Sequence, residues 1–145
     1  MLVTIRMASP NDIEQMQLLY DEYMATDIQR DSTLRQAVAD NNSEILVAEV
    51  QGNLVGLIHQ TFYVDPLHAG VCSDLLFLYV SEAFRRQRIG SMLLEKALAG
   101  AARRSVREVH VSTRADNFAA MKLYDKFQFE YAGPLLECTP DKLTD

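Results

Sequence analysis

The 145-residue chain has few cysteines, and their placement does not suit a metal centre. Cys72 and Cys138 are the only two, and they lie far apart in the sequence. No C-x-x-C spacing occurs, and His59, His68 and His110 do not complete a metal-binding pattern along the chain. We therefore expect two free thiols, no metal site and a reducing, cytoplasmic setting.

The chain also lacks an excess of basic charge. It carries 14 Lys and Arg against 20 Asp and Glu, for a formal net charge of −6. A general nucleic-acid binder is usually basic. Arginines do gather locally, at 85–88 and at 103, 104 and 107, but no aromatic residues alternate with them as stacking platforms would require. We expect no nucleic-acid partner.

Long apolar segments are missing as well. The longest apolar run, Leu75–Val80, is far shorter than the ~20 residues that a membrane-spanning helix needs. Met1–Pro10 has no charged region followed by a long apolar one, so we expect neither a signal peptide nor a membrane partner. No internal repeat, low-complexity segment or linker occurs, which predicts a single domain over residues 1–145.

The apolar pattern predicts strands and helices in alternation. The expected helices cover Ser9–Met24, Ser32–Asp40, Ile89–Arg103 and Asn117–Phe127. The expected strands cover Leu2–Met7, Glu44–Val50, Leu54–Val64, Ala69–Ser81, Arg107–Thr113, Phe129–Gly133 and Leu135–Cys138. The run of large apolar residues in Leu75–Val80 is typical of a strand buried on both faces. The order of elements indicates an α/β sandwich.

The segment Phe84–Leu94, "FRRQRIGSMLL", combines positive charge with a predicted helix start. The first amides of a helix have no internal partner, and the helix dipole favours negative charge there. Arg85, Arg86 and Arg88 would add charge-assisted bonds to phosphate, Gly90 would allow close approach, and Ser91 offers a hydroxyl. These residue types are equally compatible with a solvated basic surface.

Two segments together resemble the GCN5-related N-acetyltransferase (GNAT) superfamily. In "LYVSEAFRRQRIGSMLL", Arg85 matches the first position of the family pattern Arg/Gln-x-x-Gly-x-Gly/Ala, and Gly90 matches its second glycine. In "RADNFAAMKLYDKFQF", the family's second signature is matched by Asn117, Ala120, Leu123 and Tyr124. The order of elements over Leu2–Cys138 fits the family too. The resemblance implies a GNAT-like α/β (α+β) fold, with a mixed, mostly antiparallel sheet of about six to seven strands and helices on both faces.

The resemblance also implies acetyl-CoA as co-substrate and an amine as acceptor. Backbone groups of the Leu78–Tyr79–Val80 strand would bind the pantetheine arm, and the turn after it would hold the pyrophosphate. Asn117 would touch the arm near its thiol, and Tyr124 would be the general acid that protonates the leaving thiolate. The residues implied at the cofactor are Leu78, Tyr79, Val80, Arg85, Arg86, Gln87, Arg88, Ile89, Gly90, Ser91, Asn117 and Tyr124. Read without the motif, Asn117 suits a helix N-cap and Tyr124 a core aromatic.

The chain departs from the family pattern at several positions. Arg88 replaces the first glycine of the loop, and we expect it to be helical already, because glycine would be needed only at positive φ. Gln128 stands where glycine often precedes the phenylalanine that Phe129 matches, which would alter the end of the last helix.

The general base cannot be carried over from the family, because Leu76 and Ser112 occupy the two positions where members place a glutamate. His59 and Asp74 are the candidates that remain by location. His59 has the better unperturbed pKa for the task. Glu22 and Tyr23 would line the acceptor pocket, by analogy alone.

The leading hypothesis is an N-acetyltransferase that transfers the acetyl group of acetyl-CoA directly to a primary amine of a small molecule or a protein. The alternative is a non-catalytic CoA- or acyl-CoA-binding sensor or regulatory module on the same fold, since no base is recognisable. The sequence leaves the identity of the amine and the oligomeric state open, and a homodimer is compatible with it.

Overall fold

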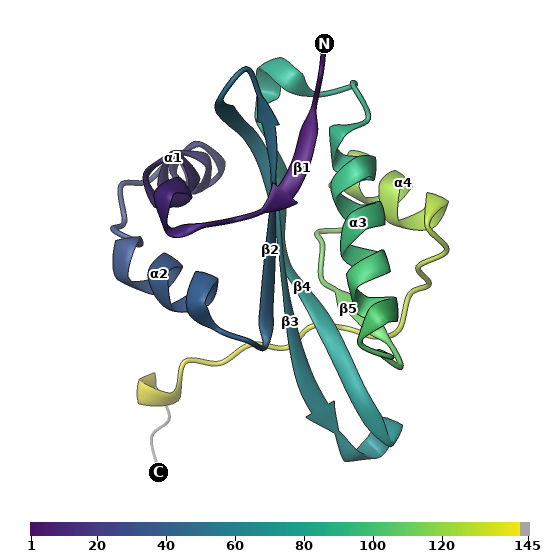
Figure 1. Ribbon diagram of the computed structural model, residues 1–145. Helices are drawn as coiled ribbons and strands as arrows, with labels where there is room; N and C mark the ends of the chain where they lie inside the picture. The colour runs from purple at the N-terminus through teal and green to yellow at the C-terminus, as the bar shows by residue number, and fades with distance from the viewer. Residues whose placement is uncertain (143–145) are drawn as a thin grey trace. The chain divides into compact units, whose positions relative to one another are not determined.

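The computed structural model describes residues 1–142, and its contacts divide the chain into two compact units, Met1–Val111 and the chain from Ser112 onward. The first unit holds a five-stranded sheet in the order β1-β2-β3-β4-β5 (Figure 1). Its strands are β1 (Thr4–Met7), β2 (Ser43–Val50), β3 (Asn53–Asp65), β4 (Gly70–Val80) and β5 (Val109–Val111). Neighbours are antiparallel except β4 and β5, which are parallel. The predicted mixed, mostly antiparallel sheet is confirmed.

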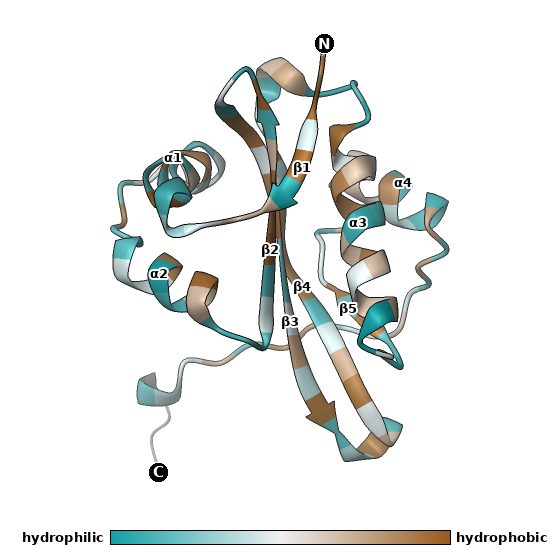
Figure 2. Ribbon diagram, viewed as in Figure 1, coloured by the Kyte–Doolittle hydropathy of each residue, from teal (hydrophilic) through white to brown (hydrophobic). Residues whose placement is uncertain are grey.

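Helices cover both faces of this sheet, as expected. On one face lie α1 (Ile13–Met24), which follows the short 3-10 helix η1 (Pro10–Asp12), and α2 (Asp31–Ala39), while α3 (Ile89–Arg103) lies on the other (Figure 1). The central strands are largely apolar (Figure 2). The core beneath α1 and α2 consists of Ile13, Met16, Leu19, Leu34, Ile45, Val47, Leu54 and Leu57. None of the helices within residues 1–142 combines the length and the apolar character needed to cross a membrane.

A two-residue turn closes the predicted β2–β3 hairpin. Gln51 and Gly52 both have positive φ, 50° and 80°, which is the pattern of a type I′ turn. Such a turn matches the right-handed twist of the strands and pairs Val50 with Asn53. A bulge between Ala48 and Glu49 then shifts the register of the rest of the hairpin by one residue.

The predicted number of six to seven strands is too high. Within residues 1–142 the sheet has five strands, and the expected closing strands Phe129–Gly133 and Leu135–Cys138 have no strand assignment. Most of their large apolar residues are exposed, with Tyr131 and Leu136 each 86% exposed. A strand needs a ladder partner as well as a suitable pattern, and these segments have the pattern alone.

The second unit contains α4 (Phe118–Lys126), and both of its ends are specified by side chains or backbone angles. At the start, Asn117 Oδ1 accepts from the amide of Ala120 at 3.1 Å, so the expected N-cap is present. At the end, Gln128 takes a positive φ of 68°. The amide of Gln128 donates to Asp125 O, and that of Phe129 to Tyr124 O, at 2.9 Å each. These bonds form a Schellman motif, which glycine usually closes.

An ion pair between the half-buried Arg6 and the buried Asp12 joins β1 to the start of α1. Arg6 donates from Nη1 to Asp12 Oδ2 at 2.8 Å and from Nη2 to Oδ1 at 3.0 Å, and the Ser9 amide also donates to Oδ2. Asp12 is only 5% exposed. The hydrogen bonds from Arg6 hold the pKa of this carboxyl below its usual range. The pair therefore sets where α1 leaves the first strand.

Replacing Asp12 with Asn should lower the free energy of unfolding at pH 7 by about 1.5–3 kcal/mol, because a charged acceptor of buried bonds is lost. The folded-state pKa of Asp12 is lowered, so its contribution is present above the ordinary aspartate pKa of about 3.9. It is lost as the pH falls through the folded-state pKa. Urea unfolding at neutral and acid pH should show the two proteins converge in acid.

The matched control is Asp31→Asn, which breaks an exposed pair with Arg35 and should cost less than about 0.5 kcal/mol. A deficit for Asp12→Asn that stays constant into acid would contradict the stabilising role of the ion pair.

Candidate functional site

The candidate site begins where β4 stops pairing with β5. Only Ser73, Asp74 and Leu75 of β4 pair with β5. On the other side, β3 pairs Gln60 with Leu75 and His59 with Phe77, which leaves Leu76 as the extra residue of a β-bulge. Leu76 is 56% exposed, so the expectation that Leu75–Val80 is buried on both faces is wrong. The bulge exposes the Leu76 side chain. It also separates the half of β4 that pairs with β5 from the half that does not.

Backbone groups of Leu78 and Val80 point to the unpaired side. The amide of Ser81 donates to Val55 O at 2.8 Å. Hydrogen-bonded residues alternate along an antiparallel ladder, so Tyr79 also turns its backbone toward β3, and its two neighbours turn theirs away. In agreement, the carbonyl of Val80 accepts from Arg85 Nε at 3.0 Å rather than from a strand. Within residues 1–142, the two residues that the resemblance implies for the pantetheine arm thus lie on a strand edge that pairs with no other strand, and Arg85 binds the Val80 carbonyl there.

Glu22, at the end of α1, forms hydrogen bonds with the end of β4 and with the start of the loop that follows β4. Its carboxylate accepts from Tyr79 Oη at 2.8 Å, from Ser81 Oγ at 3.0 Å and from the Glu82 amide at 3.3 Å. The bond from Tyr79 leads the effects that lower the pKa of Glu22, so this acceptor is ionised at neutral pH. The sequence suggested Glu22 only as an acceptor-pocket residue, and no motif marked its contact with the loop.

Four aromatic rings form the wall beside Glu22. Tyr20 stacks on Phe77 with centroids 4.2 Å apart, and Tyr23 meets Phe77 and Tyr79 edge-on at 5.1 and 5.5 Å. Arg85 lies over the Tyr79 ring at 5.4 Å. Arg85 is therefore folded against the strand end, with its guanidinium shared between a ring and a carbonyl.

The loop between β4 and α3 contains two left-handed residues. After the 3-10 helix η3 (Glu82–Phe84), Arg85 is extended, Arg86 has φ 62°, and Arg88 has φ 66° and ψ 14°. The expectation that Arg88 is already helical is wrong. Arg88 is the N-cap residue, where the chain reverses before the first helical turn, so it holds a backbone conformation that suits glycine.

The start of α3 is open to an anion. The amide of Met92 donates to Arg88 O at 3.0 Å as the first helical bond, so the amides of Ile89, Gly90 and Ser91 have no acceptor within the helix. The side chain of Arg88, the N-cap residue, forms no capping hydrogen bond with these amides. The side chains of Arg86 and Arg88 are exposed, and within residues 1–142 neither side chain forms a hydrogen bond or an ion pair. Three free amides and two unpaired cations gather at the positive end of a helix dipole.

Packing and one polar contact fix α3 to the sheet. Ile89, Leu93 and Leu94 are fully buried under its first two turns. Farther along, the buried Gln60 donates from Nε2 to the Ala97 carbonyl at 3.0 Å, and Ser73 Oγ donates to Gln60 Oε1 at 2.7 Å. The helix start is thus held rigidly beside the end of β4.

The two candidate bases lie on neighbouring strands. His59 is half-buried on β3 opposite Phe77, with Nε2 3.3 Å from Ser43 Oγ, and burial lowers its pKa. It is therefore neutral at pH 7 and able to accept a proton. Asp74 Oδ1 accepts from Tyr63 Oη at 3.0 Å and lies 3.6 Å from His110 Nδ1. Asp74 belongs to the paired half of β4 and already has partners there.

The second unit holds the remaining two predicted site residues. Asn117 lies at the start of α4 and caps it. Tyr124 is 8% exposed, and its ring meets that of Phe129 edge-on at 5.3 Å. Burial raises the pKa of Tyr124 to about 12, so its phenol keeps its proton throughout the neutral range.

Comparison with known proteins identifies the family. A sequence profile of the acetyltransferase (GNAT) family matches residues 11–129, which is most of the chain. The chain belongs to the GNAT family of acetyltransferases. It is 31% identical over 99 residues to mouse N-acetyltransferase family 8 member 3, a match that covers 68% of this chain and 44% of the mouse protein. The chain thus spans less than half the length of this curated relative.

Solved structures share the GNAT fold at lower sequence identity. A transcriptional regulator from Bacillus halodurans superimposes with a TM-score of 0.86 at 23% identity, covering 95% of this chain and 99% of that one. The acetyltransferase AAC(6')-Iy, in complex with a bisubstrate analogue of CoA and monomethyl-acetylneamine, superimposes with a TM-score of 0.81 at 16% identity, covering 96% and 98%. These likenesses establish the fold.

The left-handed conformation of Arg88 gives a stability prediction for this GNAT loop. Arg88→Gly should raise the free energy of unfolding by about 0.5–1 kcal/mol, because glycine has no Cβ to clash at positive φ. Arg88→Ala removes the same guanidinium but keeps the Cβ, so it should give no such gain. Urea unfolding of the two variants compares them directly. Equal stabilities would contradict a strained Arg88.

Proposed function

We propose that this GNAT protein is an N-acetyltransferase that moves the acetyl group of acetyl-CoA onto a primary amine. The observation that carries the proposal is the continuity of two features: a free strand edge at Leu78 and Val80, and the uncapped start of α3 that follows it. An extended pantetheine arm would add to the first as an extra strand, and a pyrophosphate would suit the second. Acetyl-CoA has both parts in that order.

The pyrophosphate would be held by the free amides of Ile89, Gly90 and Ser91. The side chains of Arg86 and Arg88 would pair with its oxygens. Gln87 lies exposed between them in the same loop. The chemistry fits, because the three free amides are donors and the two arginine side chains are cations, and no carboxylate lies among them.

The reaction would form an amide bond and break a thioester. The neutral amine nitrogen attacks the acetyl carbonyl carbon, the C–S bond breaks, the nitrogen loses a proton, and the sulfur leaves as thiolate. His59 is the better candidate for the base, because its lowered pKa keeps the imidazole neutral and able to accept a proton. Asp74 would first have to give up its contacts with Tyr63 and His110.

Tyr124 would assist the leaving sulfur as the acid. A phenol with a pKa of about 12 gives its proton to a thiolate of pKa near 8.5 only against about 5 kcal/mol. The role that fits better is that of a neutral hydrogen-bond donor to the sulfur as negative charge develops on it. Asn117 would lie near the same end of the cofactor arm.

A non-catalytic acyl-CoA-binding module is the second candidate, favoured by the apolar Leu76 and by Ser112 at the positions where relatives place a base. Both candidates require acetyl-CoA binding, which calorimetry on the whole chain measures. CoA release with a panel of polyamines, aminoglycosides and lysine peptides then separates them. Turnover of any amine supports the transferase, and binding without turnover supports the module. Absence of acetyl-CoA binding would overturn both.

Replacing Tyr124 with Phe tests this hydrogen bond to the leaving sulfur of the transferase reaction. We expect kcat to fall about 100-fold, the cost of one lost transition-state hydrogen bond, with acetyl-CoA affinity unchanged. Stopped assays of CoA release measure the rate, and calorimetry measures the affinity.

The matched control is Tyr131→Phe, since Tyr131 belongs to the same unit but is 86% exposed. It should leave kcat as in the parent protein. An unchanged kcat in Tyr124→Phe would remove the assigned role.

A further inference from the structure

A second cluster of titratable side chains lies at the far end of β4 from the candidate site. The 3-10 helix η2 (Pro66–His68) joins β3 to β4, and β5 begins beside it. Pairing of Ser73 with Val109 and of Asp74 with His110 brings residues from these distant parts of the chain together. The cluster belongs entirely to the first compact unit.

Three atoms of the cluster converge. Glu108 Oε2 lies 3.1 Å from His68 Nε2 and 3.1 Å from His110 Nε2. One donor atom from each of these residues lies within 4.8 Å of the other two. The two imidazole rings are tilted with centroids 6.0 Å apart, so their nitrogens approach the carboxylate from different directions.

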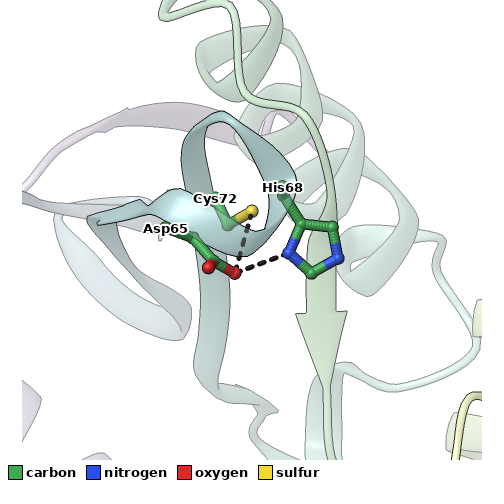
Figure 3. A group of neighbouring side chains, drawn as sticks. All are labelled: Asp65, His68 and Cys72. Carbon is green, nitrogen blue, oxygen red and sulfur yellow. Dashed lines mark hydrogen bonds and ion pairs between the residues drawn. The ribbon is translucent and has the colours of Figure 1, made fainter.

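The other nitrogen of each ring is already engaged. His68 Nδ1 lies 2.5 Å from Asp65 Oδ2 (Figure 3). His110 Nδ1 lies 3.2 Å from Tyr63 Oη, whose own proton goes to Asp74 Oδ1. Both partners therefore act as acceptors toward Nδ1–H. This leaves Nε2 of each ring as the nitrogen available to another partner, and both Nε2 atoms lie beside the same Glu108 oxygen.

Two imidazole nitrogens and one carboxylate oxygen thus converge on one point, with both N–O distances 3.1 Å. Histidine ligands of metals commonly donate their second nitrogen to a carboxylate or another acceptor, which fixes the ring and makes it a better ligand. Asp65 and Tyr63 are placed for this role.

A second group, Asp65, His68 and Cys72, also lies within ligand distance. Figure 3 shows its side chains joined through Asp65 Oδ2. However, Asp65 Oδ1 already accepts the Leu67 amide at 3.0 Å, and Cys72 is fully buried. Burial raises the pKa of the Cys72 thiol, so it keeps its proton. This group orients His68 better than it would hold an ion.

We propose that His68 Nε2, His110 Nε2 and a Glu108 carboxylate oxygen bind a divalent cation of the zinc class. Ligand atoms of a tetrahedral zinc site lie about 3.4 Å apart when the bonds are about 2.1 Å, close to the two distances of 3.1 Å. Imidazole nitrogen with one carboxylate suits zinc and similar transition metals better than Mg²⁺ or Ca²⁺.

The bound cation would act as a clip between the η2 turn and β5. The side chains of the three ligands are 29%, 38% and 51% exposed, so an ion can enter and a water can complete its coordination. β5 pairs with β4 through only three residues, so a metal link from His68 to Glu108 and His110 at the start of β5 would stabilise that pairing. The sequence predicts no metal site because 40 residues separate the ligands along the chain, while the parallel pairing that joins them is a property of the fold.

The test titrates Zn²⁺ into the chelator-treated whole chain and follows the heat of binding and the melting temperature. We expect one equivalent to bind and to raise the melting temperature. His110→Gln and Glu108→Gln should each weaken binding by roughly 100-fold or more, and Asp65→Asn by about 10- to 100-fold. His59→Gln removes a histidine outside the cluster and should leave zinc affinity unchanged. Circular dichroism verifies that each variant folds.

Cys72→Ser and Co²⁺ separate the two possible ligand groups. The assignment predicts unchanged affinity for Cys72→Ser and a Co²⁺ spectrum without a thiolate charge-transfer band. Loss of binding in Cys72→Ser, or that band, would overturn it in favour of the Asp65–His68–Cys72 group. No Zn²⁺ or Co²⁺ binding, or equal weakening by His59→Gln and His110→Gln, would show that the cluster holds ion pairs only.

Discussion

The incomplete pairing of β4 is the constraint on which the rest of the site depends. β4 is 11 residues long, yet only three of them pair with β5, and the bulge at Leu76 marks where that pairing ends. Beyond the bulge, backbone groups that a sheet would normally satisfy internally face outward at Leu78 and Val80. Unpaired strand edges recruit extended chains. In the proposed function an extended ligand would pair with this edge, and the direction of β4 would lead it to the start of α3.

The electrostatics at the start of α3 also favours binding of an anionic ligand. Cations near a helix N-terminus are unfavourable in themselves, because the dipole already makes that end positive. Within residues 1–142, Arg86 and Arg88 nevertheless have no carboxylate partners, and Glu22 already binds Tyr79, Ser81 and the Glu82 amide. The loop thus has a surplus of positive charge that a bound anion would relieve. Burial of Ile89, Leu93 and Leu94 keeps the helix in position against that repulsion.

Local features were predictable from the sequence, whereas features of pairing were not. The helices, the β2–β3 hairpin and the Asn117 cap follow from apolar period and turn chemistry. The Leu76 bulge depends on how β4 pairs with β3. Residues 129–133 and 135–138 form no strands because a strand needs a partner, which their pattern does not reveal. The left-handed conformation of Arg88 depends on the path of the loop into α3. Likewise, parallel pairing of β4 with β5 brings His68 beside His110, although their spacing along the chain does not indicate it.

The central claim is that acetyl-CoA adds to the free edge of β4. Amide hydrogen exchange, read residue by residue by NMR with and without CoA, tests it most directly. If the pantetheine arm pairs with this edge, CoA slows exchange at the amides of Leu78 and Val80 and at those of Ile89 to Ser91. The amide of Tyr79, which faces β3, serves as the internal reference and should change little. Saturating CoA that leaves the Leu78 and Val80 amides exchanging as in the free protein would contradict the claim.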